Sequence, residues 1–164
     1  MSMEQLATDC LEIHSDKGIT KAILAGHSMG TRVVIKAHCQ APNVVKGLIL
    51  MDGSNATSSA DLDTALAGFQ STDAELGYAG SAKILFAQMF YDTKHDAWKE
   101  RFIECALKVP EDIGTPLHKN IITWDGTVTS AALQAANILI LVVQSTTRDA
   151  KGGRCALEPG EIGA

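Results

Sequence analysis

Ser28 is the residue of this chain whose type and setting point most directly to chemistry. It lies in the pentapeptide GHSMG, residues 26–30, which fits the pattern G-x-S-x-G. A β-prone apolar run, residues 19–25, precedes the pentapeptide, and a helical pattern begins at Met29. A sharp turn from strand to helix holds a serine in a strained conformation with its oxygen exposed. The pattern therefore predicts a nucleophilic serine that carries out acyl transfer.

The neighbours of Ser28 have separate roles in this interpretation. Gly26 and Gly30 are expected because only glycine leaves room where the strand and the helix crowd together. The backbone N–H of Met29 is the expected oxyanion donor, at the positive end of the helix dipole. His27 is expected to shape the turn rather than to act as a base. The alternative for these five residues is a glycine-flanked turn with an inert serine.

The elements around the pentapeptide alternate between helix and strand. Ser2 and Gln5 fit a capping box at the start of a helix that Gly18 would end. "VVKGLILMDG", residues 44–53, predicts a second buried strand, and "NILILVVQS", residues 137–145, predicts a third of the buried parallel type. Strand, helix and strand within about 35 residues form a βαβ unit. The expected fold class is α/β, with an incomplete parallel sheet of about three strands and flanking helices.

A long helical insertion is expected between the second and third strands. Residues 54–80 are rich in small and polar residues, and apolar residues recur at helical spacing through most of residues 81–108. The expected division of the chain is therefore a partial core, residues 1–54 and 125–164, and a helical insertion, residues 55–124.

Composition and charge exclude several classes of function for this chain. The chain has 164 residues, which suits a single domain, and its formal net charge of −5 offers no basic patch for nucleic acid or an anionic membrane. The apolar run at residues 138–143 is too short to span a bilayer, and the first residues lack the features of a signal peptide. Four scattered cysteines indicate free thiols in a reducing compartment. We expect a cytoplasmic protein without a nucleic-acid or membrane partner.

The stretch "AGHSMGTRVVIKAHCQAPNVVKGLILMDGS" resembles the nucleophile-elbow region of the α/β-hydrolase superfamily, close to its capped esterases and lipases. "ALQAANILILVVQSTTRD" is similar to the later strand after which that family places its catalytic acid. The resemblance covers residues 19–54 and about 131–149, and the helical middle lies where the family inserts its cap. It implies a serine hydrolase acting on a small-molecule ester or related acyl substrate. Acyl transfer by an activated serine requires neither a metal nor an organic cofactor, so none is expected.

The family also implies a triad, in which a histidine takes the proton of Ser28 and an acid orients that histidine. Asp149 follows the third expected strand and is the first candidate for the acid, and Asp52, at the end of the second, is the alternative. The family's chain order is serine, acid, histidine, but no histidine follows Asp149. His38 is expected on a helix surface, and a structural role explains each histidine better than a catalytic one. The five are His14, His27, His38, His95 and His118.

The sequence is compatible with three functions. The first is a serine hydrolase whose base is an atypical residue. The second is an inactive piece of such an enzyme, because the family's opening strands and closing histidine have no counterpart here. The third is a non-catalytic binding module that uses the aromatic residues of the insertion, Phe86, Phe90, Trp98 and Phe102, although such a set is more often core. Three parallel strands would leave apolar sheet edges or faces uncovered. We therefore expect low stability of the isolated chain, a homo-oligomer that covers the exposed sheet edges, or a truncated chain.

Overall fold

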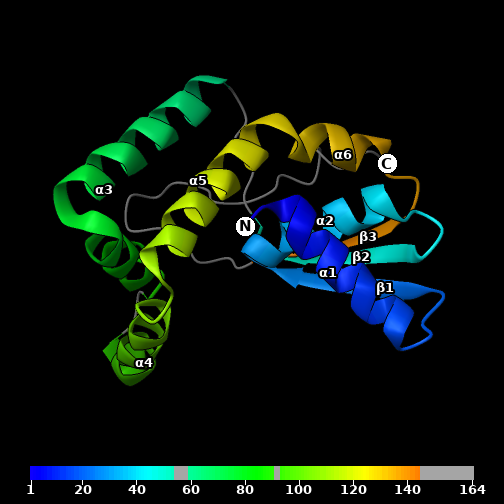
Figure 1. Cartoon of the computed structure of the whole chain (residues 1–164), viewed down its shortest axis with the longest axis horizontal. Coiled ribbons are helices and arrows are strands. Elements are labelled where there is room, and N and C mark those ends of the chain that lie inside the picture. The colour runs from blue at the N-terminus through cyan, green and yellow to red at the C-terminus, as the bar shows by residue number, and fades with distance from the viewer. Residues whose placement is uncertain (54–58, 91–92, 145–164) are drawn as a thin grey trace.

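The computed structural model describes residues 1–53, 59–90 and 93–144 of the chain. Within these residues the order of elements is α1, β1, α2, β2, α3, η1, α4, α5, α6 and β3, where η1 is a single turn of 3-10 helix. In Figure 1, α1 and α2 lie beside the sheet, and α3, α4 and α5 extend away from it. The carboxyl ends of the strands point toward that helical arm.

The sheet has three parallel strands, β1 (Ala22–His27), β2 (Val45–Met51) and β3 (Leu139–Val143), in the order β1-β2-β3. Each strand occurs where the sequence predicts one, because a short β-branched and leucine-rich run between turn residues is the usual pattern of a buried strand. The prediction of an α/β fold with a partial parallel sheet is confirmed.

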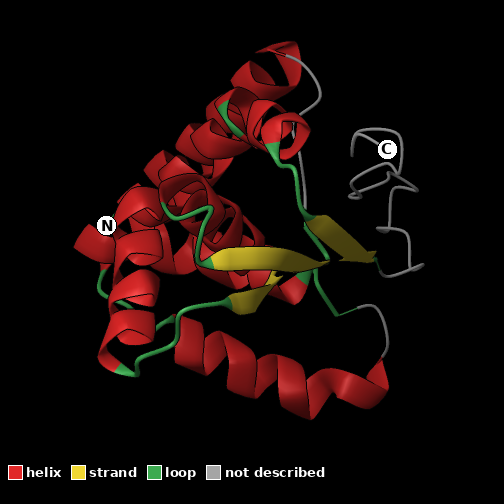
Figure 2. Cartoon of the chain, turned by 90° about the vertical axis from the view of Figure 1, so that its right-hand side faces the viewer, coloured by secondary structure: helices red, strands yellow, loops and turns green. Residues whose placement is uncertain are grey.

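Two helices lie on one side of the sheet, α2 against the strands and α1 against α2. The first, α1 (Met3–Asp16), begins as the capping pattern predicts, because the Ser2 side chain accepts a hydrogen bond from the Gln5 N–H at 3.2 Å. The second, α2 (Met29–Gln40), is the crossover between β1 and β2. Figure 2, at a right angle to Figure 1, shows most of the helices above and to the left of the strands and a further helix below them.

The hydrophobic core lies between these helices and the covered face of the sheet. Its buried members come from the strands, from α1 and α2, and from the later helices: Met3, Ala7, Leu24, Val34, Ile35, Ala37, Val45, Leu48, Leu50, Trp124 and Leu133. The last two show that the chain after β2 returns to the core before β3 begins. A buried aromatic or leucine side chain contributes about 1.5–3 kcal/mol to folding, so these contacts tie the helical arm to the sheet.

The opposite face of the sheet is apolar and open. Ile23 on β1 is 68% exposed, and Leu139, Leu141 and Val143 on β3 are 87%, 57% and 48% exposed. Parallel register aligns all four side chains on one face, since Ile23 pairs through Gly47 with Leu139. No helix among the described elements covers them. The expectation of an uncovered apolar face is confirmed for the described residues.

The helical arm consists of α3 (Ser59–Ala87), η1 (Thr93–His95), α4 (Asp96–Ala106) and α5 (Glu111–Thr127). A short helix, α6 (Thr129–Ala135), connects the arm to β3. α3 packs against α5 and α4, whereas α5 also reaches α1, α2 and α6. α5 is therefore the element that joins the arm to the core.

The contact between α3 and α5 is close and partly polar. α3 bends at Gly77, whose φ of 66° suits glycine, and the ring of the next residue, Tyr78, lies where a side chain at Gly114 of α5 would be. Further along, the rings of Phe69 and His118 meet with centroids 4.4 Å apart. Burial lowers the pKa of His118, and the carboxylate of Asp73 on α3 partly opposes that shift.

Folding stability should therefore fall in mild acid through His118. Because the pKa of His118 in the folded protein lies below its ordinary value of 6.5, the unfolded chain binds the proton more readily. The stabilisation that the uncharged His118 ring gives to the folded protein is complete above about pH 6.5. It is lost as the pH falls through the lowered pKa. In urea unfolding, H118F should show a smaller loss of unfolding free energy between about pH 7 and pH 5 than the wild type. H95Q controls for the loss of a histidine outside this contact, and an unchanged pH slope in H118F would contradict the assignment.

Candidate active site

Ser28 lies at the junction of β1 and α2 in a backbone conformation that non-glycine residues rarely adopt. Its φ is 51° and its ψ is −117°, which places φ in the left-handed region. Its N–H donates to the Met51 carbonyl of β2 at 2.9 Å. The Ser28 side chain makes no capping hydrogen bond to α2, although Ser28 occupies the N-cap position. The hydroxyl is therefore not used to cap the helix that it precedes.

Three donors hold the carbonyl oxygen of Ser28. The Thr31 N–H lies 3.1 Å from it, the Thr31 hydroxyl 2.7 Å, and Nη1 of Arg32 3.0 Å. Arg32 is 3% exposed, so a buried cation lies directly beneath the turn. Together with the bond to Met51, these donors fix the peptide groups on both sides of Ser28 and maintain its strained conformation.

Sequence reasoning missed Arg32. The feature of the sequence that could have identified Arg32 is its position one helical turn after Ser28. It is followed there by the apolar residues Val33 and Val34. An arginine in that place either snorkels to solvent or pairs with a buried acceptor, and only the fold shows that the acceptor is the carbonyl of Ser28.

The two glycines of the pentapeptide differ in the space around them. A Cβ on Gly26 would lie 2.5 Å from the Gly30 carbonyl carbon and 2.7 Å from the Thr31 nitrogen, both backbone atoms. A Cβ on Gly30 would have no described atom within 4 Å. The expected crowding is therefore present at Gly26, where β1 meets the first turn of α2. It is absent among the described residues at Gly30, because a Cβ there would point into open space.

The first turn of α2 directs backbone N–H groups toward the end of the sheet. The N–H of Met29 belongs to this turn, in which N–H groups have no intrahelical acceptor. The positive end of the helix dipole lies at the same place. This arrangement can stabilise a negatively charged oxygen beside Ser28.

Of the two candidates for the catalytic acid, Asp52 lies within the residues that the structure describes. It follows β2, has a φ of 47°, and donates its N–H to the Val143 carbonyl of β3 at 2.9 Å. Its Oδ2 lies 4.0 Å from Nε2 of His27. The two side chains meet because His27 pairs with Met51 in the register of β1 and β2. The sequence places these residues 25 positions apart, and the sheet brings them together at its carboxyl edge. Asp149, the first candidate, lies outside the described residues.

No histidine ring contacts the Ser28 hydroxyl within the part of the chain that the structure describes. His14 is bonded to the Cys10 carbonyl at 2.7 Å, and His118 packs on Phe69. His38 is buried, with Nδ1 3.3 Å from the Val45 carbonyl, so the prediction that it lies on a helix surface is wrong. The reason is that α2 presents this side chain to β2, where a backbone acceptor is available. His95 lies on the helical arm.

The described residues also bear on metal binding, membrane insertion and thiol chemistry. No group of three or more His, Cys, Asp or Glu side chains in the described ranges is arranged to hold a metal ion. Among the helices of those ranges, none has the length and apolar character needed to cross a membrane. Cys10, Cys39 and Cys105 are free thiols, and burial raises the pKa of Cys10.

The described fold is a partial parallel α/β sheet with a strained serine at a strand-to-helix turn. The chain matches the family described as alpha/beta hydrolase fold over residues 1–138. It therefore belongs to the α/β-hydrolase fold family. No curated protein matches the chain.

Solved structures with the same fold cover most of this chain. A thermophilic esterase from Thermogutta terrifontis has a TM-score of 0.73 and 18% identity over 91% of this chain and 56% of its own. A structure from work on carboxylesterases of Nitrososphaera gargenis has a TM-score of 0.65 and 20% identity, with 90% and 55% covered. An enol-lactonase from Burkholderia xenovorans has a TM-score of 0.62 and 14% identity, with 90% and 56% covered. The chain thus spans little more than half the length of these structures.

Proposed function

We propose that this chain is a serine hydrolase that acts on an ester or related acyl substrate, with Ser28 as the nucleophile. The observation that carries the proposal is the backbone of Ser28, with φ 51° and ψ −117°, between a parallel strand and a helix N-terminus. Strain of this kind costs about 1–3 kcal/mol and persists where the surrounding structure enforces it. Here a buried arginine, a threonine and β2 all bond to the turn, which supports a turn built to present the serine.

In the proposed reaction Oγ of Ser28 attacks the substrate carbonyl carbon and loses its proton to a general base. The carbonyl oxygen becomes negatively charged and accepts a hydrogen bond from the Met29 N–H near the N-terminus of α2. Collapse of the tetrahedral intermediate leaves an acyl group on Ser28 and expels the alcohol, which takes the proton held by the base. Water then attacks the acyl group and releases the carboxylic acid and free Ser28. This sequence needs no metal or organic cofactor. We propose Asp149 as the acid that orients the base, with Asp52 as the alternative.

The proposed reaction also needs a general base that accepts the proton of Ser28. Four described histidines have other partners and the fifth, His95, lies on the helical arm. The proposal therefore places the base outside the described residues. Relatives extend over nearly as much chain again as this one covers, and their names, which include esterases and an enol-lactonase, support esters and lactones as the substrate class. The helical arm, α3 to α5, would serve as the cap above the carboxyl edge of the sheet.

A fluorophosphonate probe tests the nucleophile directly. The probe reacts covalently only with an activated serine, so the folded chain should become labelled at Ser28, slowly in the absence of a placed base and not at all in S28A. Intact mass and peptide mapping give the site. A well-folded chain, checked by circular dichroism, that takes no label would contradict the assignment.

The second candidate function is that of a family member that does not turn over a substrate. Such a protein would be either an inactive piece of the enzyme or a binding module. The observation in its favour is that no described histidine reaches Ser28 while about 45% of each relative has no counterpart here. This candidate predicts a folded chain without labelling. A cytoplasmic location and a homo-oligomer formed through the open sheet face remain predictions, and sedimentation velocity over a concentration series tests the latter.

A further inference from the structure

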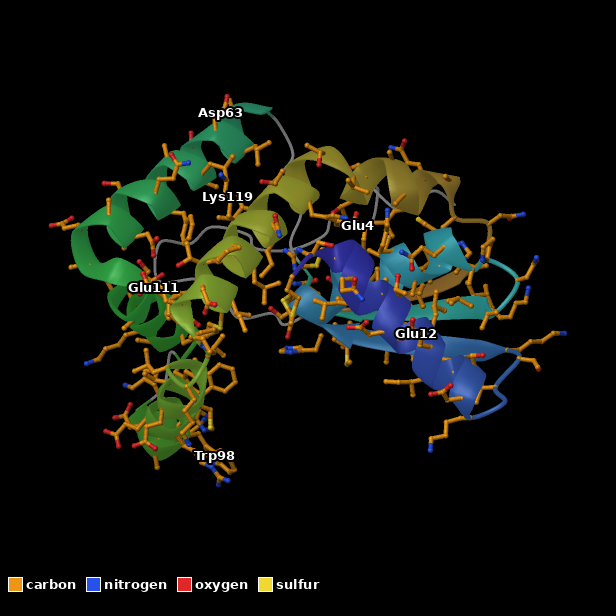
Figure 3. The ribbon with its side chains drawn as sticks, viewed as in Figure 1. Glu4, Glu12, Asp63, Trp98, Glu111 and Lys119 are labelled. Atoms are coloured by element: carbon orange, nitrogen blue, oxygen red, sulfur yellow. The ribbon has the colours of Figure 1, made fainter. Side chains whose placement is uncertain are left out.

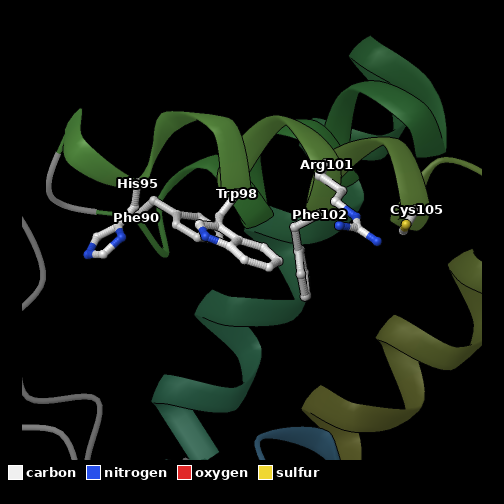
Figure 4. Close-up of a pocket in the computed structure, with 6 residues that line it drawn as sticks. All are labelled: Phe90, His95, Trp98, Arg101, Phe102 and Cys105. Atoms are coloured by element: carbon white, nitrogen blue, oxygen red, sulfur yellow. The ribbon is translucent and has the colours of Figure 1, made fainter.

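An open hollow of about 520 Å³ lies at the α4 end of the helical arm. The residues that line it lie between the end of α3 and the last turn of α4: Phe90, His95, Trp98, Arg101, Phe102 and Cys105 (Figure 4). α4 packs on α3 and η1, and Figure 3 shows Trp98 on α4, well away from the sheet. The hollow is therefore separate from Ser28. Its volume is within the range of small-molecule sites, about 300–1,000 Å³.

Aromatic contacts hold the apolar wall of the hollow in place. The ring of Phe102 meets that of Phe86 edge-on, with centroids 5.2 Å apart, and lies 6.1 Å from that of Phe90. These contacts join α4 to α3 and restrain Phe102 before any ligand arrives. Trp98 is 64% exposed and Phe102 49% exposed, so both rings present apolar surface to the hollow. This finding differs from the expectation that the aromatic set is core.

Among the described residues that line the hollow, Arg101 is the one arginine or lysine. Its guanidinium carbon lies 5.7 Å from the centroid of the Trp98 ring, a cation–π contact that places the charge beside the apolar wall. No carboxylate in the described residues forms an ion pair with Arg101. The nearby carboxylate of Asp96 is instead paired with Lys99 at 2.6 Å.

The sequence of α4 separates acidic from aromatic residues. Trp98, Arg101, Phe102 and Cys105 have the spacing i, i+3, i+4 and i+7, which places them on one face of the helix. Glu100 falls on the opposite face by the same rule, whereas Glu104 lies at the side of the helix, three residues after Arg101. Among the residues that the structure describes, the lining of the hollow thus combines aromatic walls with the guanidinium of Arg101 and contains no carboxylate.

We propose that this hollow binds a small monocarboxylate with an apolar acyl or aryl body. The carboxylate would accept two hydrogen bonds from the Arg101 guanidinium, whose planar fork suits that group. The apolar body would lie against Trp98 and Phe102. A neutral ligand of the same shape would leave Arg101 without an anion, and a dicarboxylate would place its second charge against the aromatic wall.

The test is a titration of the folded chain with 3-phenylpropionate, followed by tryptophan fluorescence and by calorimetry. The chain has two tryptophans, and Trp124 is buried in the core, so a change in emission reports on Trp98. We expect saturable binding, and binding at least about tenfold weaker for 3-phenylpropan-1-ol, the neutral analogue. R101M should lose the preference for the acid, whereas R101K should keep part of it.

Control variants separate this site from Ser28. K99M removes a positive charge from α4 that does not line the hollow, and it should bind the acid as the wild type does. S28A should also bind unchanged, whether or not the fluorophosphonate experiment succeeds. Equal affinity for acid and alcohol, wild-type binding in R101M, or loss of binding in S28A would each overturn the proposal. W98F should retain calorimetric binding, somewhat weakened, while the fluorescence change disappears.

Discussion

Replacing Gly26 with alanine should lower the free energy of unfolding by about 3 kcal/mol and abolish labelling of Ser28. The added Cβ would collide with Gly30 and Thr31, and because those atoms belong to the backbone no side-chain rotation can relieve the clash. Either β1 or the first turn of α2 must shift. Such a shift would break the bond from the Ser28 N–H to Met51 or those to the Ser28 carbonyl, and the turn would lose its shape.

Gly30 provides the matched control within the same pentapeptide. Alanine at Gly30 meets no described atom within 4 Å, and alanine in a helix is favoured over glycine by up to about 1 kcal/mol. G30A should therefore be as stable as the wild type or slightly more stable, and it should still be labelled. Urea unfolding measures both variants. Equal stability of G26A and G30A would show that the junction of β1 and α2 is not crowded as described.

Replacing Ser28 with glycine should remove labelling completely and, at the same time, raise stability relative to S28A by about 1 kcal/mol. Serine and alanine both carry a Cβ and both experience the strain of φ 51° and ψ −117°. Glycine adopts that region without steric cost, which recovers about 1–3 kcal/mol, and its larger entropy in the unfolded chain offsets part of the gain. The nucleophile and the strain would thus be removed together.

The comparison between S28G and S28A measures the free-energy cost of the strained backbone at position 28, because both variants lack the hydroxyl. Thermal and urea unfolding of the two give the difference directly. If S28G were no more stable than S28A, the turn would not be strained, and the main support for a nucleophilic Ser28 would be gone. The result does not depend on finding a substrate or a base.

Several features of the protein follow from the sequence alone. The strands, α2, the start of α1 at Ser2 and the position of Ser28 are all local, because the period of apolar residues and the placement of glycine and serine act over a few residues. The three-strand parallel sheet follows from two buried-type runs linked by a helix and a third run later in the chain. The family resemblance also depends on short contiguous stretches, residues 19–54 and about 131–149.

Only the tertiary structure decided which side chains are buried and which residues from distant positions meet. It placed Arg32 under the Ser28 carbonyl, His38 against the Val45 carbonyl, and His27 beside Asp52. It also left Trp98 exposed on the arm, where helical spacing by itself favours a core residue. The physical reason is that periodicity defines the face of an element, whereas burial and pairing depend on which other element packs against that face and in which register.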